Sequence, residues 1–191
     1  EQRLVVYGAG TAGTGMADQI SAAMQRDGLS REEAKKRVWL IDINGLVTDD
    51  MPNLPDYQQE YARPAAEVAA WTKTNGKISL LEVVKQIRPT ILIGTSTDHG
   101  AFTEEVVKAL CVGVERPILL PLSNTTEKIE VMPADAVQWS DGKALISVGI
   151  PVPPVSYKSV NYHIGQANNA MLYPGLGLGV IVSGAKEVTD G

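Results

Sequence analysis

Three glycines directly after the first apolar run constrain this chain more than any other feature. The run covers residues 4–7, and Gly8, Gly10 and Gly13 follow it in the spacing G-x-G-x-x-G. Residues 11–24 then have the apolar periodicity of a helix. A strand that enters a helix through such a loop is typical of α/β domains that bind a dinucleotide.

Each glycine of this loop has its own physical reason. Gly8 allows a tight turn, Gly10 lets phosphate oxygens approach the backbone, and Gly13 lets the helix pack closely on the strand. Thr11 and Ala12 begin the helix, whose N-terminus carries partial positive charge and favours a phosphate. We therefore expect these five residues to bind a pyrophosphate. The alternative is a glycine-rich turn that binds no ligand.

Apolar β-rich runs alternate with helical patterns along the rest of the chain, which predicts a parallel sheet with crossover helices. The expected strands are 4–7, 38–41, 91–93, 118–120 and 144–148. The expected helices are 11–24, a short helix after 30, 64–71, one from 79 to before 89, 102–111, 133–139 and a packed helix over 174–183. Residues 42–56 have no regular pattern, and residues 155–163 are typical of a hairpin. The sequence thus predicts one α/β domain over residues 1–191, a three-layer Rossmann-type fold with a doubly wound, mostly parallel sheet.

An acidic residue ends the second expected strand. Asp42 follows Ile41 where the adenosine ribose of a dinucleotide would lie. Its carboxylate can accept both ribose hydroxyls and would repel a 2′-phosphate, and neither Ile43 nor Asn44 supplies a cation against that repulsion. We therefore expect NAD rather than NADP as the cofactor. The alternative is that Asp42 is an ordinary loop acid.

Small and polar residues follow three later segments of the chain. Gly94 and Thr95 follow one strand, Ser123 and Asn124 follow the next, and residues 165–169 follow the hairpin. Ligands of doubly wound sheets lie outside the carboxyl ends of the strands, and an asparagine amide can both donate and accept hydrogen bonds. The same residues could form turns or cap helices, and for any single asparagine the two interpretations are balanced. Their shared placement at strand ends favours a ligand site, and we expect Gly94, Thr95 and Ser123 to contact the cofactor.

Composition and charge exclude several classes of partner. The net charge of -5 provides no basic surface for a phosphate backbone, so we expect no nucleic acid. No apolar run approaches the length of a membrane span, so we expect no membrane association. Cys111 is the only cysteine and can form no internal disulfide, which fits a cytoplasmic protein.

The sequence contains no complete catalytic motif. His99 and His163 are the only histidines, and neither has the neighbours of a metal site or a catalytic triad. The acids Asp49–Asp50 are typical of a solvated loop, and Glu104–Glu105 are typical of a helix start. Cys111 has no activating neighbour. We therefore expect neither catalytic residues nor metal ligands in this chain, whose abrupt ends predict that it is part of a longer enzyme.

Longer motifs extend across nearly the whole chain: residues 7–15, 41–46, 89–94, 100–105, 116–118, 122–124, 139–144, 165–170 and 174–179. The most specific are Gly-Gln-Ala-Asn-Asn-Ala at 165–170 and Pro-Gly-Leu-Gly-Leu-Gly at 174–179. Together they resemble the NAD-binding domain of the malic enzyme family, in the lineage of bacterial NAD-dependent malic enzymes and malolactic enzymes. The resemblance implies that this domain is excised from a longer malic-type enzyme.

The resemblance also implies a reaction and roles for particular residues. The family binds L-malate, NAD(P) and a Mn or Mg ion; it oxidises malate by hydride transfer and then removes CO₂. Asn124 and Asn169 match positions that contact malate, and Asn168 matches one beside the nicotinamide. The tyrosine acid, the lysine base and the metal carboxylates of the family lie upstream, outside this chain. We therefore expect the chain alone to be inactive and the full-length enzyme to be a homo-dimer or tetramer.

One departure from the family pattern and three alternatives remain. The family has proline after the asparagine of Ser-Asn-Pro-Thr, whereas this chain has Thr125, which leaves the orientation of Asn124 open. The choice between malic and malolactic activity is also open. An amino-acid or methylene-tetrahydrofolate dehydrogenase would share the glycine motif but not residues 165–170. A non-catalytic NAD-sensing module is a further alternative.

Overall fold

The computed structural model describes residues 2–189 and contains one large sheet. Its seven strands lie in the order β3-β2-β1-β4-β5-β6-β9. They are β1 (Leu4–Tyr7), β2 (Val38–Asp42), β3 (Gly45–Leu46), β4 (Ile91–Gly94), β5 (Ile118–Pro121), β6 (Leu145–Val148) and β9 (Gly165–Gln166). All neighbouring pairs are parallel except β2 with β3. The chain runs outward in both directions from β1 and β4, which makes the sheet doubly wound.

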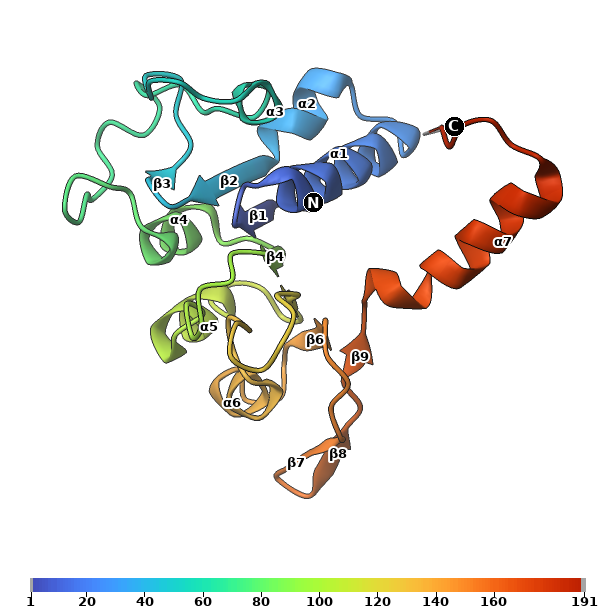
Figure 1. Cartoon of the computed structure of the whole chain (residues 1–191). Coiled ribbons are helices and arrows are strands. Elements are labelled where there is room, and N and C mark those ends of the chain that lie inside the picture. Colours follow the sequence, from blue (N-terminus) through green and yellow to red (C-terminus); the bar gives the residue numbers. More distant parts are fainter. Residues whose placement is uncertain (1, 190–191) are drawn as a thin grey trace.

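Helices cover both faces of this sheet. The helices within residues 2–189 are α1 (Thr11–Arg26), α2 (Arg31–Lys36), α3 (Asp56–Gln59), α4 (Leu80–Ile87), α5 (Glu104–Leu110), α6 (Pro133–Trp139) and α7 (Tyr173–Ser183), with a 3₁₀ turn η1 (Asn169–Met171) before α7. Of these, α7 does not cover the sheet. The hairpin of β7 (Val155–Tyr157) and β8 (Val160–Tyr162) is separate from the sheet. Figure 1 shows α1 and α2 on one side of the strands and α4, α5 and α6 on the other. The predicted three-layer Rossmann-type fold is confirmed.

The first strand divides the hydrophobic core into two halves. Successive side chains of a strand point to opposite faces, so Val5 packs toward α4 and α5 while Leu4 and Val6 pack toward α1. All three are fully buried. A continuous apolar run, without polar alternation, is what a strand covered on both faces requires.

The helix predicted over residues 64–71 is wrong. This segment forms consecutive turns with i→i+3 hydrogen bonds, from Glu67 N to Pro64 O (2.9 Å) and from Trp71 N to Val68 O (3.0 Å). Its apolar residues pack individually rather than as one helical face: Val68 is buried and the Trp71 ring stacks on Trp39 with 5.4 Å between centroids. Tertiary packing thus overrides a helical pattern that is only two turns long.

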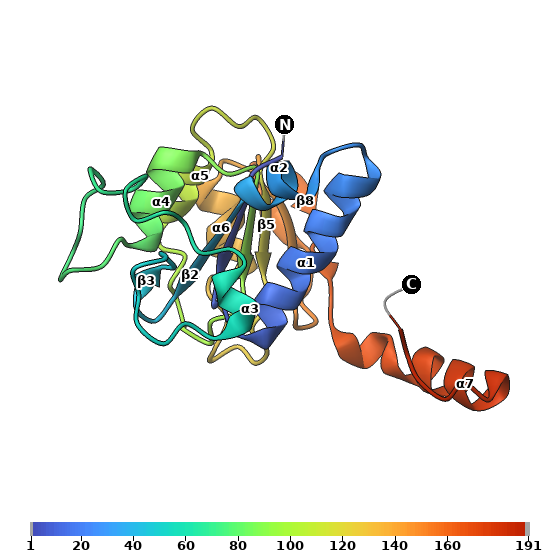
Figure 2. The same cartoon turned by 90° about the horizontal axis from the view of Figure 1, so that it is seen from above.

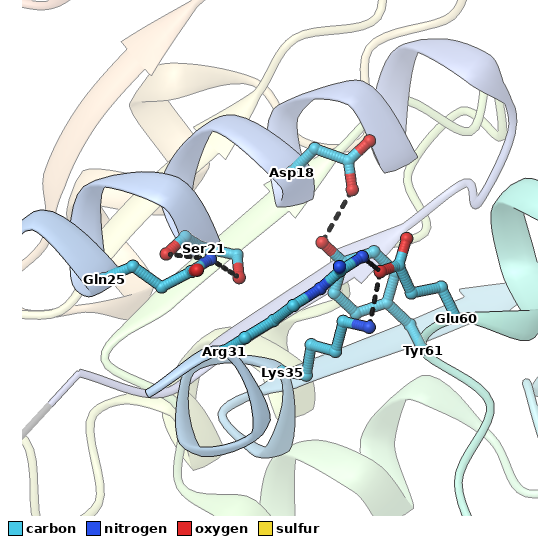
Figure 3. A network of polar contacts seen from close by, with 7 residues as sticks. All are labelled: Asp18, Ser21, Gln25, Arg31, Lys35, Glu60 and Tyr61. Carbon is cyan, nitrogen blue, oxygen red and sulfur yellow. Dashed lines mark hydrogen bonds and ion pairs between the residues drawn. The ribbon is translucent and has the colours of Figure 1, made fainter. Parts of the chain in front are cut away.

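Residues 42–56, which have no regular pattern in the sequence, include β3 and lead into the single turn of α3. A network of side chains holds the two residues that follow α3 (Figure 3). Tyr61 donates a hydrogen bond to Asp18 Oδ1 of α1 (2.7 Å), and Glu60 accepts from both Arg31 and Lys35 of α2. The hydrogen bonds from Lys35 and Arg31 hold the pKa of the Glu60 carboxyl below its ordinary value. As a result, α3 is attached to the two helices on its side of the sheet.

The last helix forms where the sequence predicts it, but within residues 2–189 it does not pack against the sheet or its helices. None of the residues of α7 is buried, and Leu178, Ile181 and Val182 are 62%, 77% and 78% exposed. Figure 2 shows α7 projecting away from the sheet and its helices. The prediction of a packed helix is therefore wrong for residues 2–189, and a helix that is apolar all round requires a partner from elsewhere.

Candidate functional site

Two of the three loop glycines are required by the packing of the protein itself. Gly8 has φ of 103°, and a Cβ on it would lie 2.5 Å from the carbonyl carbon of Thr95. A Cβ on Gly13 would lie 2.2 Å from Gly8 O. Any larger residue at either position would force β1, α1 and the end of β4 apart. Both positions therefore behave as the sequence predicts for a tight turn and a close helix contact.

Gly10 differs, because the protein alone does not require a glycine there. It is the N-cap of α1 with extended backbone, and no heavy atom of the described chain lies within 4 Å of an added Cβ. The first helical hydrogen bond runs from Thr14 N to Gly10 O (3.0 Å), which leaves the preceding N–H groups at Thr11, Ala12 and Gly13 without helical acceptors. No described side chain caps them. This helix end is thus open to an anion that approaches the backbone closely.

Asp42 is held in one orientation at the carboxyl end of β2. Its Oδ1 accepts from Ile43 N (2.9 Å) and its Oδ2 accepts from Gln58 Nε2 (2.6 Å). The same Gln58 nitrogen donates to Ala9 O of the glycine loop (2.7 Å), and Gln58 is only 5% exposed. Gln58 therefore links the acid of β2 to the glycine loop. No sequence motif indicates this residue, because it belongs to α3, 16 positions away from Asp42.

A hollow of about 320 Å³ lies beside these residues, at the carboxyl ends of β1, β2 and β4. Its lining residues are Tyr7, Gly8, Asp42, Ile43, Ser96 and Asp98. Tyr7 donates a hydrogen bond to Asp98 Oδ2 (2.7 Å), and burial followed by this bond raises the pKa of the phenol above its ordinary value. Tyr7 therefore remains a hydrogen-bond donor at neutral pH. In doubly wound sheets this edge, where the chain reverses direction, is where ligands bind.

Three predicted cofactor residues contact other parts of the chain. Thr95 Oγ1 donates to Gly8 O (2.8 Å) and supports the glycine loop. A Cβ on Gly94 would lie 2.5 Å from Glu130 Cδ. Ser123 Oγ donates to Glu130 Oε1 (2.5 Å). A contact of Gly94, Thr95 or Ser123 with NAD stays a prediction, whereas each has a clear structural partner.

The structure brings two of the three predicted asparagines into contact. Asn168 Nδ2 donates to Asn124 Oδ1 (2.9 Å) and to Gly149 O (2.8 Å), while its Oδ1 accepts from Ala170 N (2.9 Å). Asn169 begins η1 directly after Asn168. Segments that lie far apart in the sequence thus meet at one edge of the sheet.

Thr125 adopts a backbone conformation that proline cannot. Its φ is 73°, in the left-handed region, whereas the ring of proline fixes φ near −65°. The loop after Asn124 therefore differs in geometry from one that a Ser-Asn-Pro sequence would form. The departure seen in the sequence has a direct structural consequence beside the paired asparagines.

Asp49, Asp50 and Glu104 have structural partners, and Cys111 is half-buried. Asp49 Oδ1 accepts from Ala65 N (2.9 Å), and Asp50 Oδ1 accepts from Thr48 Oγ1 (2.6 Å). Glu104 lies in the first turn of α5, as predicted, and pairs with Lys108 at 2.5 Å. Burial raises the pKa of the Cys111 thiol. These contacts explain the residues as loop, helix-start and packing groups.

Residues 2–189 contain neither a metal-binding cluster nor a membrane-spanning helix. No group of three His, Cys, Asp or Glu side chains there is arranged to hold a metal ion, and this holds for His99 and His163. Within the same part of the chain, no helix has the length and apolarity to cross a membrane.

The doubly wound sheet, the glycine loop before α1 and the fixed Asp42 define a dinucleotide-binding α/β domain. The family model described as "Malic enzyme, NAD binding domain" matches residues 1–191, and the chain belongs to this family.

Curated relatives agree with the family. The chain is 56% identical over its whole length to NAD-dependent malic enzyme 3 of Bacillus subtilis and 48% identical to NAD-dependent malic enzyme of Photorhabdus laumondii. It is 47% identical to the malolactic enzyme of Lactococcus lactis. It covers 34%, 34% and 35% of these proteins, respectively, so it spans about a third of the length of the relatives it matches.

Proposed function

We propose that residues 1–191 form one NAD-binding domain of a longer enzyme that oxidises and decarboxylates L-malate. Family membership supports the proposal, and relatives three times as long supply the room for a separate catalytic domain. The observation that carries it is the open N-terminus of α1 beside Asp42, which Gln58 links to the glycine loop. This arrangement supports a pyrophosphate at the helix end and a ribose at Asp42.

The residues present fit NAD from its adenosine end to its phosphates. Asp42 would accept the hydroxyls of the adenosine ribose, and its charge would repel a 2′-phosphate. The free N–H groups from Thr11 to Gly13 would hold the pyrophosphate, with Gly10 leaving room for its oxygens. When bound, NAD supplies the nicotinamide that accepts a hydride from the malate carbon carrying the hydroxyl.

The paired asparagines support a place for the nicotinamide and the substrate. Asn168 would lie beside the nicotinamide, and Asn124 and Asn169 would bind malate. An asparagine amide can accept from the malate hydroxyl and donate to its carboxylates. Gly94, Thr95 and Ser123 would support the same edge. The full-length enzyme would also bind a Mn or Mg ion, with ligands from the part of the polypeptide outside this domain.

The malic and malolactic relatives differ in the product that the full-length enzyme would release. A malic enzyme releases pyruvate and NADH, whereas a malolactic enzyme retains NADH and releases lactate. The test is to incubate the full-length protein with L-malate, NAD and Mn²⁺ and to measure pyruvate, NADH and lactate. Pyruvate with NADH is the expected result, and lactate without free NADH would assign the malolactic reaction. Absence of malate consumption would contradict the proposal.

We also propose that the full-length protein is a cytoplasmic homo-dimer or tetramer. The free thiol of Cys111 fits a reducing compartment, and the family resemblance implies the oligomer. Light scattering of the full-length protein would measure its mass, and a monomer would contradict the oligomer.

A further inference from the structure

A fully buried carboxylate lies behind the paired asparagines. Glu130 is 0% exposed and belongs to the loop between β5 and α6. Within residues 2–189 no Lys, Arg or His side chain forms an ion pair with it. A carboxylate without a cation is costly to bury unless hydrogen-bond donors replace its water. Hydrogen-bond donors of the protein therefore have to replace the water around the Glu130 carboxylate.

Donors from two strand ends converge on this carboxylate. Glu130 Oε1 accepts from Ser96 N (2.8 Å), Ser96 Oγ (2.9 Å) and Ser123 Oγ (2.5 Å), and its Oε2 faces Ser123 N at 3.4 Å. Ser96 follows β4 and Ser123 follows β5. Hydrogen bonds to a charged acceptor are stronger than neutral ones, so the carboxylate holds the two loops together.

The surrounding backbone is shaped around Glu130. Gly94 has no side chain, and a Cβ there would lie within 2.5 Å of Glu130 Cδ. Thr97 N donates to Ser123 Oγ (2.9 Å) and so joins the same network. Thr97 has φ of 57°, a left-handed conformation that costs a β-branched residue free energy and persists only where neighbours enforce it. The network therefore maintains a strained loop at the ligand edge of the sheet.

The chain of contacts continues from Glu130 to the predicted substrate residues. Ser123 directly precedes Asn124, and Asn124 Oδ1 accepts from Asn168 Nδ2 (2.9 Å). We infer that Glu130 is a positioning residue, which through Ser123 sets the orientation of Asn124 and Asn168 toward the substrate and the nicotinamide. This inference rests on the proposed function. Asp42 and Gln58, which form the proposed adenosine half, share no hydrogen bond with Glu130 within residues 2–189, although Ser96 contacts Glu130 and also lines the hollow beside Asp42.

The first test compares Glu130→Ala and Glu130→Gln, together with a control variant, in the full-length enzyme. Glu130→Ala removes all four acceptor contacts, and misplacing the asparagines should lower kcat/KM for malate about a hundredfold. The Kd for NADH should change by less than about threefold, because the pyrophosphate and adenosine contacts remain. Glu130→Gln keeps an oxygen for the three donors at Oε1 and should recover to within about tenfold of wild type.

The control is Val84→Ala, which creates a cavity under α4, away from the strand ends. It should destabilise the fold without changing kcat/KM for malate. Equal losses in Val84→Ala and Glu130→Ala would overturn the inference, as would a glutamine variant as impaired as alanine. A parallel rise in the Kd for NADH and the KM for malate would also overturn it.

A double-mutant cycle tests whether Glu130 acts through Ser123. Ser123→Ala alone should lower kcat/KM for malate, and the double variant should be no worse than Glu130→Ala, because both changes break one pathway. Additive losses would show that the two residues act separately and would overturn the inference.

Hydrogen exchange separates this inference from the proposed function. In Glu130→Ala, the amides of residues 96–98 and 123–125 should exchange faster together, whereas Val84→Ala should leave both loops unchanged. Unchanged exchange in Glu130→Ala would overturn the anchoring role even in an enzyme active on malate. Faster exchange in a protein that does not consume malate would support the anchor and contradict only the proposed function.

Discussion

At the scale of single residues, the glycine loop contains glycines of two kinds. Gly8 and Gly13 are needed because backbone atoms occupy the space where a side chain would lie. Gly10 has open space around it, so under the proposed function only the bound pyrophosphate would require a glycine there. The two kinds should respond differently to the same substitution.

The first prediction uses this difference. Gly13→Ala should lower the free energy of unfolding by about 2 kcal/mol, because its Cβ collides with Gly8 O. Gly10→Ala should change the free energy of unfolding by less than about 0.5 kcal/mol, since a poorer N-cap is offset by a less flexible unfolded chain. It should nevertheless weaken NAD binding at least about tenfold by keeping the pyrophosphate from the N–H groups. Urea unfolding and NADH fluorescence titration of the full-length protein measure the two effects.

The second prediction concerns the choice of cofactor. Asp42→Ser removes the carboxylate that would accept the ribose hydroxyls, so the KM for NAD should rise about ten- to a hundredfold. The KM for NADP should fall, because the repulsion of its 2′-phosphate is gone. Asp56→Ser changes an exposed acid of α3 in the same way and is the matched control. An unaltered ratio of the two KM values would show that the ribose assignment is wrong.

At the scale of elements, the short helix α3 depends on side chains rather than on its own helical hydrogen bonds. It has four residues, too few for a stable helix in isolation. The contacts of Tyr61 with Asp18, and of Glu60 with Arg31 and Lys35, attach the chain after α3 to α1 and α2 (Figure 3). Gln58 can therefore reach both Asp42 and Ala9.

The third prediction follows from the lowered pKa of Glu60. A carboxyl whose pKa is lower in the folded state stabilises the protein above its unfolded pKa, and this stabilisation is lost as the pH falls through the folded pKa. Glu60→Gln should therefore be less stable than wild type at about pH 7, by at most about 1 kcal/mol. The difference should shrink as the pH falls below about 4, near the unfolded pKa of a glutamate.

Urea unfolding at several pH values measures this difference. Glu115→Gln, an exposed acid distant from α3, is the matched control and should follow wild type throughout. A difference between Glu60→Gln and wild type that does not depend on pH would contradict the role of the ion pairs.

At the scale of the whole molecule, the sheet and its two helix layers form a packed body, and α7 lies outside it (Figures 1 and 2). The apolar side chains of α7 and the absence of any buried residue within it are unusual for an isolated domain. Because the relatives are about three times as long as this chain, we propose that the rest of the same polypeptide covers α7.

The fourth prediction tests the exposed face of α7. The isolated 191-residue chain should bind the dye ANS, and the double substitution Ile181→Lys, Val182→Lys should reduce that fluorescence to about half or less. The melting temperature of the isolated chain should be the same with and without the double substitution, because neither side chain is buried. Val112→Lys, at an exposed apolar residue after α5, should leave most of the fluorescence. In the full-length enzyme the same double substitution should be destabilising; equal stability there would contradict a covered α7.

The fifth prediction concerns activity. The isolated chain should not consume malate with NAD and Mn²⁺ and should bind NAD weakly, because it contributes only one part of the proposed site. Turnover by this chain at the rate of the full-length enzyme would contradict this division. The coupled assay of NADH and pyruvate described above measures it.

Local patterns in the sequence predicted most of the fold and part of the site. Strand and helix periodicity located β1, β2, β4, β5, β6 and the helices α1, α2, α4, α5, α6 and α7. Elements as short as β3, β9 and α3 have too few residues for a period to be recognised. The turns at 65–70 resemble a helix in sequence, but the separate packing of Val68 and Trp71 decides their conformation.

The sequence by itself determined the class of this domain, because a glycine at a tight turn and an acid at a strand end act through their immediate neighbours along the chain. Only the tertiary structure decided how the site is held. Gln58 and Glu130 reach partners 16 and 34 residues away, and nothing local marks either of them. Buried polar groups find their hydrogen-bond partners through the fold, not along the chain. The glycine loop therefore indicates what the domain binds, and the packing around it decides how the binding residues are oriented.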